Sequence, residues 1–510
     1  MAKHRKPKDL LSSPVRQASP GHPSPERPAA FYEAGRRDPQ RKQRREPGSA
    51  NTAILRAGLS LREQARHLDQ NHDISIGILD TLIQNVVGPH GIGIEPQPRR
   101  TDGTIHDELA RQLLTLWRDW QRVPEVTRCH NWPAAQRLAA RSWLRDGEVL
   151  AQLLDGSTPY LDHGTQVPLS LELIEADLLP LDFHSVSPRI TSGVETNGWG
   201  RPVGYHLYRS HPGDGFRFAP GAALRRLSAD RVLHLKLTDR INQTRGVSIL
   251  KAVILRLDDL KDYEESERIA AKVAASMAAF IRKGAPEIYD PSRDGNGEEV
   301  PRDLRFRPGM VFDDLEPGEE IGTIDTKRPN PNLELHRRGQ LRAVASGTRV
   351  TYSSASRDYD GSYSSQRQEL VEGFSAYGVL ASDFIGGFVQ PVWERFVAIA
   401  RASGAIRVPA GVDLISLDDA LFIPPQAPWI DPLKEASAWE LLEARGYASA
   451  PEIIRRRGQN PIDVLEQQAR WLRLCAERGL DFSAAPALTA NQAEPEPNQD
   501  VQHARSRTRA

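Results

Sequence analysis

The longest helical pattern in the chain covers residues 248–284, where apolar side chains recur three and four positions apart. That spacing places them on one face of a helix. Ser248 is a suitable residue to cap its start, and Gly284 followed by Pro286 is a suitable end. Residues 258–268 in its middle are nearly all charged, so one globular core does not enclose the helix. By itself the pattern favours a long surface helix of a large domain.

The residues after this helix change that interpretation. Residues 305–325 have a strand-like pattern with two Pro-Gly turn signals, and a second helical pattern follows at about 333–348. From Thr351 the chain becomes a polar, aromatic segment with almost no aliphatic side chains. A helix leading out, a small β unit, a helix leading back and an exposed loop together predict a stalk with a tip on a larger body.

The remaining patterns predict an α+β body, in which flanking helices pack an antiparallel sheet. Four tryptophans at helical spacing are expected in its core, namely Trp117, Trp120, Trp132 and Trp143. Alternation of period two predicts strands at 149–154, 169–174, 190–195, 203–209 and 232–237, with Asn197-Gly198 as a hairpin turn. Helices are predicted in two segments over 51–87, and at 105–121, 132–146, 366–401, 433–445, 450–457 and 461–478.

Composition restricts the class of protein. The 510 residues include 67 basic and 67 acidic side chains, so the net charge does not demand a nucleic-acid partner. The length allows one body with a stalk, or two to three domains. Cys129 and Cys475 are too few for a disulfide framework or a cysteine-based zinc site, which fits a reducing cytosol. No apolar run resembles a signal peptide or a membrane span.

Residues 1–50 are rich in Pro, Arg, Lys and Ser and nearly free of aliphatic side chains. Such a segment cannot bury enough apolar surface to offset chain entropy, so a disordered basic tail is predicted. The basic run at 41–45 would suit nucleic acid, but a solvated tail is the favoured interpretation. Residues 483–510 are predicted to form a second disordered tail.

Deleting residues 1–45 is expected to leave the melting temperature nearly unchanged, because this segment has too little apolar content to join a core. Differential scanning fluorimetry of the full and the truncated chain checks this expectation. A fall of several degrees in the truncated chain would show instead that the segment packs on the rest of the protein.

Eight short segments follow one another in a specific order. They are VVGPHGIGIEPQP from Val86, RDGEVLAQLL from Arg145, LELIEADLL from Leu171, GRPVGYHLYR from Gly200, RGVSIL from Arg245, DYEESERIAAKVAA from Asp262, YSSASRDYDGSYSSQRQEL from Tyr352 and PPQAPWIDPLKEA from Pro424. Each one alone is a weak signal. Their joint order, over about residues 51–480, resembles the lambda-type phage portal protein family.

The resemblance implies a portal fold with an antiparallel-sheet wing, a long helical stem, a small β-containing clip and a C-terminal helical crown. The segments that it implies are the wing at 51–246, the first stem helix at 247–284, the clip at 285–331, the second stem helix at 332–349, the tunnel loop at 350–365, a wing helix at 366–401 and the crown at 402–482.

The resemblance also implies a function. The chain is expected to form a homo-oligomeric ring, a dodecamer, at one vertex of a phage or prophage capsid, through which double-stranded DNA is packaged and ejected without sequence-specific contacts. The expected partners are the terminase large subunit, the major capsid and scaffold proteins, and the head-tail connector proteins. The expected location is the virion, and the host cytoplasm during assembly. No membrane contact, cofactor, metal ion or catalytic residue is expected.

Channel residues are expected on the second stem helix and on the loop after it. Arg338, Arg342 and Arg349 fall in one helical stripe by their spacing, and a ring would repeat that stripe as collars of positive charge beside phosphates. Salt bridges between subunits, to acids of the first helix such as Asp258, Asp262 and Glu265, are an equally weighted alternative that is compatible with the first. The loop is expected to line the bore with Tyr352, Ser353, Ser354, Ser356, Arg357, Tyr359 and Tyr363.

The clip is expected to dock partner proteins through Arg305, Arg307, Asp313, Asp314, Glu316, Glu319 and Glu320. Its acids would also suit Mg²⁺, so a metal-dependent nuclease is one alternative function, although a solvated pair of tight turns is the favoured interpretation. A non-channel intracellular scaffold that binds a protein through the long helix is another. The sequence lacks the HExxH, GxxxxGK[ST] and GxSxG patterns of common catalytic sites.

Overall fold

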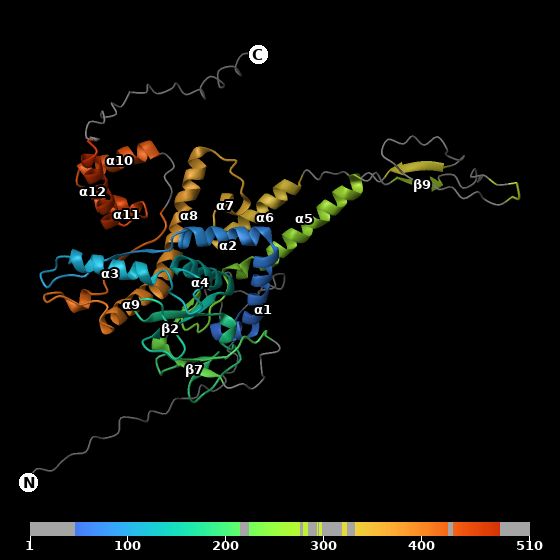
Figure 1. Cartoon of the computed structure of the whole chain (residues 1–510). Helices are drawn as coiled ribbons and strands as arrows, with labels where there is room; N and C mark the ends of the chain where they lie inside the picture. The colour runs from blue at the N-terminus through green and yellow to red at the C-terminus, as the bar shows by residue number, and fades with distance from the viewer. Residues whose placement is uncertain are drawn as a thin grey trace, which may run out of the picture. The chain divides into compact units, whose positions relative to one another are not determined.

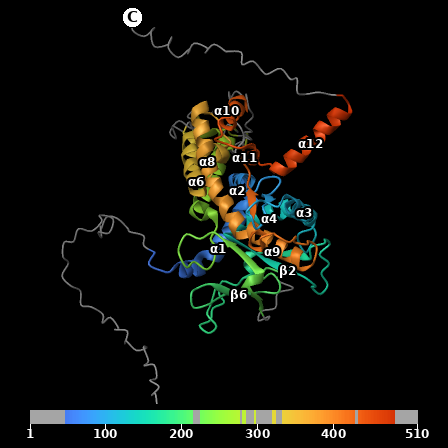
Figure 2. The ribbon, with the colours of Figure 1, turned by 90° about the vertical axis from the view of Figure 1, so that its left-hand side faces the viewer.

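A computed structural model of the chain describes residues 46–214, 224–275, 279–283, 293, 295–297, 319–323, 332–426 and 432–479. Figures 1 and 2 show helices α2, α3 and α4 above strand β2 (Glu148–Asp155), and the strands pair antiparallel, which confirms the predicted mixture of helices and sheets. The helices are α1 (Ala50–Asn71), α2 (Asp73–Val86), α3 (Asp107–Trp120), α4 (Trp132–Asp146), α5 (Ile254–Ala275), α6 (Leu333–Thr348), α7 (Tyr352–Ser356), α8 (Tyr363–Phe384), α9 (Gln390–Ala402), α10 (Pro432–Ala444), α11 (Ala450–Arg456) and α12 (Pro461–Glu477). A π-helical segment, Ile385–Val389, joins α8 to α9.

The core of the body is a cluster of aromatic rings from α3, α4 and α9. The ring centroids of Trp117 and Trp120 lie 4.7 Å apart, and Trp132 meets Trp117 edge-on at 5.8 Å. Trp393 and Phe396 of α9 approach Trp117 at 5.3 and 4.9 Å. Burying such rings accounts for much of the apolar surface that a domain removes from water. The prediction of core tryptophans is confirmed, since Trp117, Trp120, Trp132 and Trp143 are at most 1% exposed.

The strands of the body form separate antiparallel sheets, in the orders β3-β2-β8, β4-β5-β6-β7 and β1-β11. The strands are β1 (Gly93–Pro96), β2 (Glu148–Asp155), β3 (Leu169–Ile174), β4 (Ile190–Thr191), β5 (Val194–Thr196), β6 (Pro202–Leu207), β7 (Arg225–Ser228), β8 (Val232–Lys236) and β11 (Ala420–Ile423). The hairpin turn at Asn197-Gly198 is confirmed between β5 and β6. The single strand predicted at 190–195 is wrong, because Ser192 and Gly193 have φ of 50° and 79° and turn the chain back there.

The helix predicted over residues 248–284 is interrupted at both ends. Ser248 caps a 3₁₀ turn, Ile249–Ala252, by accepting the N–H of Leu250 at 3.1 Å, and α5 begins only at Ile254. At the other end, β9 (Ala279–Lys283) pairs antiparallel with β10 (Glu319–Thr323), and Ile281 lies opposite Ile321. The prediction was wrong there because Phe280 and Ile281, which fit the helical spacing, also have strong strand preference, and their partner strand is distant in sequence.

Helices α5 and α6 lie side by side (Figure 1). The predicted returning helix is confirmed, since α6 covers Leu333–Thr348. Tyr263 and His336 hold the pair together through rings 4.8 Å apart, and Arg337 Nε donates to Glu264 Oε1 at 2.7 Å. Along α5, no described side chain from Lys261 to Lys272 is buried. Apart from the buried Leu260, the charged middle of the predicted helix therefore lies outside the core, as expected.

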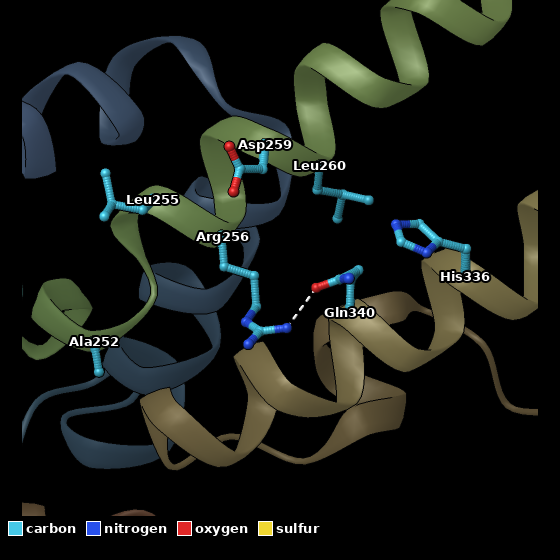
Figure 3. Close-up of a pocket in the computed structure, with 7 residues that line it drawn as sticks. All are labelled: Ala252, Leu255, Arg256, Asp259, Leu260, His336 and Gln340. Atoms are coloured by element: carbon cyan, nitrogen blue, oxygen red, sulfur yellow. Dashed lines mark hydrogen bonds between the residues drawn. The ribbon is translucent and has the colours of Figure 1, made fainter. Parts of the chain in front are cut away.

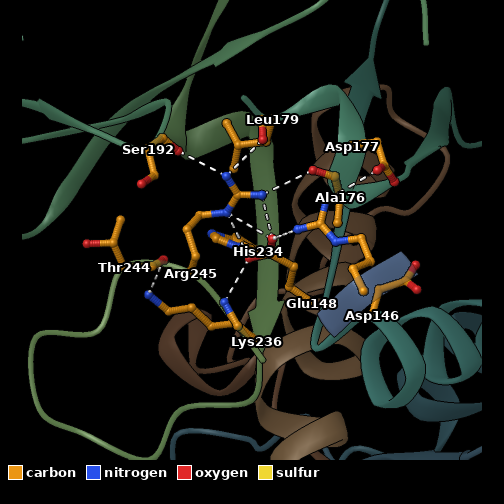
Figure 4. A network of polar contacts seen from close by, with 12 residues as sticks. Asp146, Glu148, Ala176, Asp177, Leu179, Ser192, His234, Lys236, Thr244 and Arg245 are labelled. Carbon is orange, nitrogen blue, oxygen red and sulfur yellow. Dashed lines mark hydrogen bonds and ion pairs between the residues drawn. The ribbon is translucent and has the colours of Figure 1, made fainter. Parts of the chain in front are cut away.

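A buried ion network fixes the segment that leads into α5 (Figure 4). Glu148 at the start of β2 is fully buried, and Arg245 is 1% exposed. Arg245 Nε donates to both carboxylate oxygens of Glu148 at 2.8 and 3.0 Å, and the backbone N–H of Gly246 donates to Glu148 Oε2 at 2.9 Å. The backbone segments at Gly147 and Gly246 approach so closely that a Cβ on Gly246 would lie 1.9 Å from the carbonyl oxygen of Gly147. Only glycine fits there.

The same network includes two further side chains. His234 Nε2 lies 3.0 Å from Glu148 Oε2, and Arg62 Nη2 donates to Glu148 Oε1 at 3.1 Å. Burial alone would raise the pKa of Glu148, but the Arg245 charge and the bonds from His234 and Arg245 hold it well below its ordinary value. Burial lowers the pKa of His234, against the opposing effect of the Glu148 carboxylate. Glu148 is therefore a buried carboxylate that stays ionised.

The C-terminal helices contact the body through polar side chains. Arg455 of α11 donates to both carboxylate oxygens of Glu95 at 2.8 and 2.9 Å, and Asn460, the cap of α12, donates to the carbonyl oxygen of Ile94 at 3.4 Å. Asp463 of α12 pairs with Arg118 of α3. These contacts attach α11 and α12 to β1 and α3. In the described part of the chain no helix combines the length and apolarity needed to cross a membrane.

Candidate nucleic-acid interface

The segment that follows α6 is more ordered than the loop predicted at residues 350–365. The Thr351 hydroxyl caps α7 by accepting the N–H of Ser354 at 3.2 Å, and the Ser362 hydroxyl caps α8 by accepting the N–H of Ser365 at 3.3 Å. The sequence prediction of a continuous loop was wrong because a run of Ser and Thr suits helix caps as well as loops. Only residues 357–362 connect the two helices.

Two of the predicted channel arginines meet the loop. Arg338 donates to Glu334 Oε1 at 2.9 Å and lies 3.7 Å from Asp358 Oδ2. The Arg342 guanidinium lies 5.4 Å from the centroid of the Tyr352 ring, within the range of a cation–π contact. The Tyr352 hydroxyl in turn donates to Asp358 Oδ2 at 3.1 Å. We call Arg338, Arg342, Tyr352 and Asp358 the loop cluster.

Asp358 changes the electrostatics expected for this site. The backbone N–H of Asp360 and then the Tyr352 hydroxyl hold the pKa of Asp358 below its usual value, with a smaller contribution from Arg338. The carboxylate therefore stays ionised and offsets part of the positive charge of the two arginines. Because the pair is partly exposed, it is weak and a phosphate can compete with Asp358 for Arg338. The predicted collar is thus less positive than its arginines alone suggest.

Arg349 does not share the helical stripe of Arg338 and Arg342. It is the C-cap of α6, with φ of 62° in the left-handed region, and its backbone N–H donates to the carbonyl oxygen of Ala345. The stripe prediction fails for Arg349 because the helical offset of eleven residues applies only while the helix continues. Its surroundings are a cavity of about 300 Å³ that is also lined by Lys236, Lys251, Asp239 and Asp383.

The loop residues divide into structural and exposed ones. Ser356 donates to the carbonyl oxygen of Tyr352 at 2.8 Å, and the backbone N–H of Ser353 donates to Glu369 at 2.9 Å, so both positions stabilise α7. Ser354 and Tyr352 are likewise half-buried. Three predicted residues remain available to a ligand, since Arg357 is exposed and Tyr359 and Tyr363 are 60% and 56% exposed.

The alternative of salt bridges between subunits stays a prediction, and within one chain a different pair of residues joins the two helices. Within this chain the bridge to the acidic helix runs from Arg337 to Glu264, one position away from the arginine and the acid that were named. The alternation of acids on one helix and arginines on the other could have indicated such pairing. The rotation of the two helices about their axes decides which arginine takes part, and that rotation depends on tertiary packing.

The predicted clip residues lie mostly outside the described residues. This holds for Arg305, Arg307, Asp313, Asp314 and Glu316. Glu319 and Glu320 belong to β10, where the backbone register places them opposite Lys283 and Arg282, while their side chains lie outside the described part. The register therefore sets acidic positions opposite basic ones.

One group of side chains within the described residues has the make-up of a metal site. Ligand atoms of Glu175, Asp177 and His211 lie within 4.8 Å of one another. Asp177, however, is already paired with Arg66, and at 3.4 Å with Arg62. The two positively charged guanidinium groups beside the Asp177 carboxylate would repel a divalent cation, so these residues fit a metal ion poorly.

Comparison with known proteins decides the family. The model of the family described as phage portal protein, lambda family, matches residues 36–380. The chain belongs to the lambda family of phage portal proteins. The matched range includes α5, α6, α7 and most of α8, and therefore the whole loop cluster.

Relatives of this family member have been described. The probable portal protein of Halomonas phage phiHAP-1 is 26% identical over 461 residues, which cover 87% of this chain and 86% of the relative. A chain in the neck of a native gene transfer agent particle, computed with C12 symmetry, is 15% identical over 80% of this chain and 94% of its own, with a TM-score of 0.41. A chain from the virion of the native gene transfer agent particle is 12% identical, and the match covers 81% of this chain and 99% of that chain, with a TM-score of 0.42. At these TM-scores the assignment rests on the family match.

Proposed function

We propose that the chain is the subunit of a portal ring at one capsid vertex, through which double-stranded DNA enters during packaging and leaves during ejection. The observation that carries this proposal is the family match over residues 36–380. A ring requires an interface between two different surfaces of the same chain, with a rotation that closes. The protein would act in the virion, as a structural component rather than an enzyme. The acids on which the nuclease alternative depends, from Asp313 to Glu320, have side chains outside the described residues, so that alternative is left untested.

The loop cluster and the exposed loop residues are proposed to face the channel. A duplex must slide through, so its contacts should be weak and independent of sequence. The loop suits this requirement, because Arg338 and Arg342 are engaged by Asp358 and Tyr352, while Arg357, Tyr359 and Tyr363 stay exposed. Few unpaired cations mean little counterion release, and so little tendency to hold the DNA in place.

The clip is proposed to dock the terminase large subunit and later the head-tail connector proteins. Changing Glu316, Glu319 and Glu320 to Lys is expected to leave ring assembly intact and to weaken terminase binding and packaging, because charge complementarity steers such docking. Pull-down with terminase and the DNA content of heads measure the effect. In a matched control, three exposed glutamates of other segments, Glu63, Glu108 and Glu440, are changed to Lys, and packaging is expected to stay normal. Normal packaging by the clip variant would remove this assignment.

The function itself is tested in the genome that carries the gene. Deleting the gene is expected to abolish the filling of heads with DNA, and a plasmid copy is expected to restore it. Sedimentation of the particles and nuclease-protected DNA are the two readouts. Filled heads in the deletion strain would contradict the proposal.

A further inference from the structure

A groove between α5 and α6 has an exposed apolar rim that no described part of the chain covers (Figure 3). Its volume is about 430 Å³. Leu255 at the rim is 74% exposed, whereas Leu260, which points toward His336, is only 2% exposed (Figure 3). Arg256 reaches across from α5 to donate to Gln340 on α6. Asp259, one turn after Leu255, is exposed and has no ion pair with any described residue.

A second unpartnered surface lies on α8. Val371 and Val379 are 60% and 56% exposed, although both are β-branched apolar side chains. Between them Ser375 and Gly378 are exposed, and a Cβ on Gly378 would meet no heavy atom within 4 Å. A helix with small residues on its outer face allows another helix to approach closely. Arg367, one turn before Val371, is exposed and has no ion pair with any described residue.

The two surfaces match in spacing and in charge. Leu255 precedes Asp259 by four residues, and Arg367 precedes Val371 by four residues. Four residues are about one helical turn, so each pair lies on one face of its helix. In an antiparallel crossing, Leu255 would lie against Val371 while Asp259 lies against Arg367. Both charges would then gain a partner that the single chain does not supply.

We propose that the α5 face with Leu255 and Asp259 docks on the α8 face with Arg367 and Val371 of the next copy of this chain. The inference rests on the proposed ring, for which it names the interface. The two surfaces do not meet within one chain, since α6 lies between α5 and α8 in Figure 1. DNA is a poor occupant of the groove, because Asp259 and the neighbouring Asp258 and Asp262 repel phosphate.

Charge reversal tests the proposed pair. Asp259→Arg and Arg367→Asp, each alone, are expected to reduce the fraction of ring in mass photometry by about tenfold, because each places like charges together at every interface. The double variant is expected to recover ring formation, which also shows that each single variant failed at the interface rather than in folding. Single variants that assemble like the wild type would overturn the interface. A wild-type chain that forms no ring, either alone or after co-expression with the capsid scaffold protein, would instead overturn the proposed function.

Cross-linking gives an independent readout. In a chain with Cys129→Ser and Cys475→Ala, oxidation of a Leu255→Cys, Val371→Cys variant is expected to give a ladder of covalent multimers. A mixture of the two single-cysteine variants is expected to stop at dimers. The matched control, Leu255→Cys with Val186→Cys, uses a residue that is 96% exposed on the sheet region and is expected to stay monomeric. A ladder from the control, or a cross-link confined to one chain, would contradict the proposal.

Discussion

Replacing Arg245 with Met is expected to lower the free energy of unfolding by about 3–5 kcal/mol, because it leaves the buried Glu148 carboxylate without its main counter-charge. Arg245 contributes two bonds from Nε to Glu148, and it also donates to the carbonyl oxygens of Ala176, Leu179 and Ser192. Loss of the side chain therefore leaves acceptors unpaired as well. Denaturant unfolding followed by tryptophan fluorescence measures the change, since the aromatic core reports on the same body.

Two variants make this result specific. Arg201→Met removes an exposed arginine and is expected to change the free energy by less than about 0.5 kcal/mol. Combining Arg245→Met with Glu148→Gln is expected to recover part of the loss, because the uncompensated charge is gone. Equal stability of wild type and Arg245→Met would show that the network does not stabilise the segment before α5.

The pH dependence of stability follows from the same network. The folded pKa of Glu148 lies below the ordinary 4.5, so its stabilising contribution is complete above about pH 4.5 and is lost as the pH falls through the folded pKa. The folded pKa of His234 is also lowered, from 6.5. Below about pH 6.5 this histidine takes up a proton more readily in the unfolded chain than in the folded one, so the free energy of unfolding falls. Unfolding midpoints of the wild type are therefore expected to fall steadily on acidification from that point.

Replacing residues 354–362 with a Gly/Ser segment is expected to yield rings and heads that retain DNA poorly or package it incompletely. The replacement removes Asp358, so Arg338 and Tyr352 lose their shared partner, and it removes the exposed Arg357 and Tyr359. Ring assembly should survive, because these residues contribute one buried side chain, Ala355, to the core. Nuclease-protected DNA per head is the measurement.

A matched control replaces residues 157–160, another exposed segment with one exposed tyrosine, Tyr160, and is expected to package normally. The single change Arg357→Glu is expected to reduce packaging less at high salt than at low salt, since screening weakens both a phosphate contact and its repulsive counterpart. If the replaced segment instead prevents the subunit from folding, the loop is part of the core and its channel assignment is wrong.

Local signals in the sequence predicted the helices well and the short strands poorly. The bounds of α6 could be read from periodicity, and the core position of Trp117 from its apolar neighbours, because both depend on nearby residues. Strands β1, β7 and β11 have four residues each, too few to show an alternating pattern. The strand β9 was missed because only its pairing with β10 distinguishes it from the end of a helix.

The candidate site was predicted in part for the same reason. Arg338, Arg342 and Tyr352 were named from their spacing and composition, and the fold brings them together. Asp358 was not named as their partner, since its approach to Arg338 depends on the left-handed turn at Arg357 that follows α7. The buried Glu148 and Arg245 gave no local signal either, because one lies on a strand and the other in a loop distant in sequence.

The central claim, a ring-shaped DNA channel, is tested most directly by the mass and shape of the purified full-length protein. Mass photometry is expected to show one species of on the order of a dozen subunits of 56.8 kDa each. Electron microscopy of the same particles is expected to show a ring with an open centre, either for the protein alone or after co-expression with the capsid scaffold protein. A chain that stays monomeric or dimeric under both conditions would contradict the account.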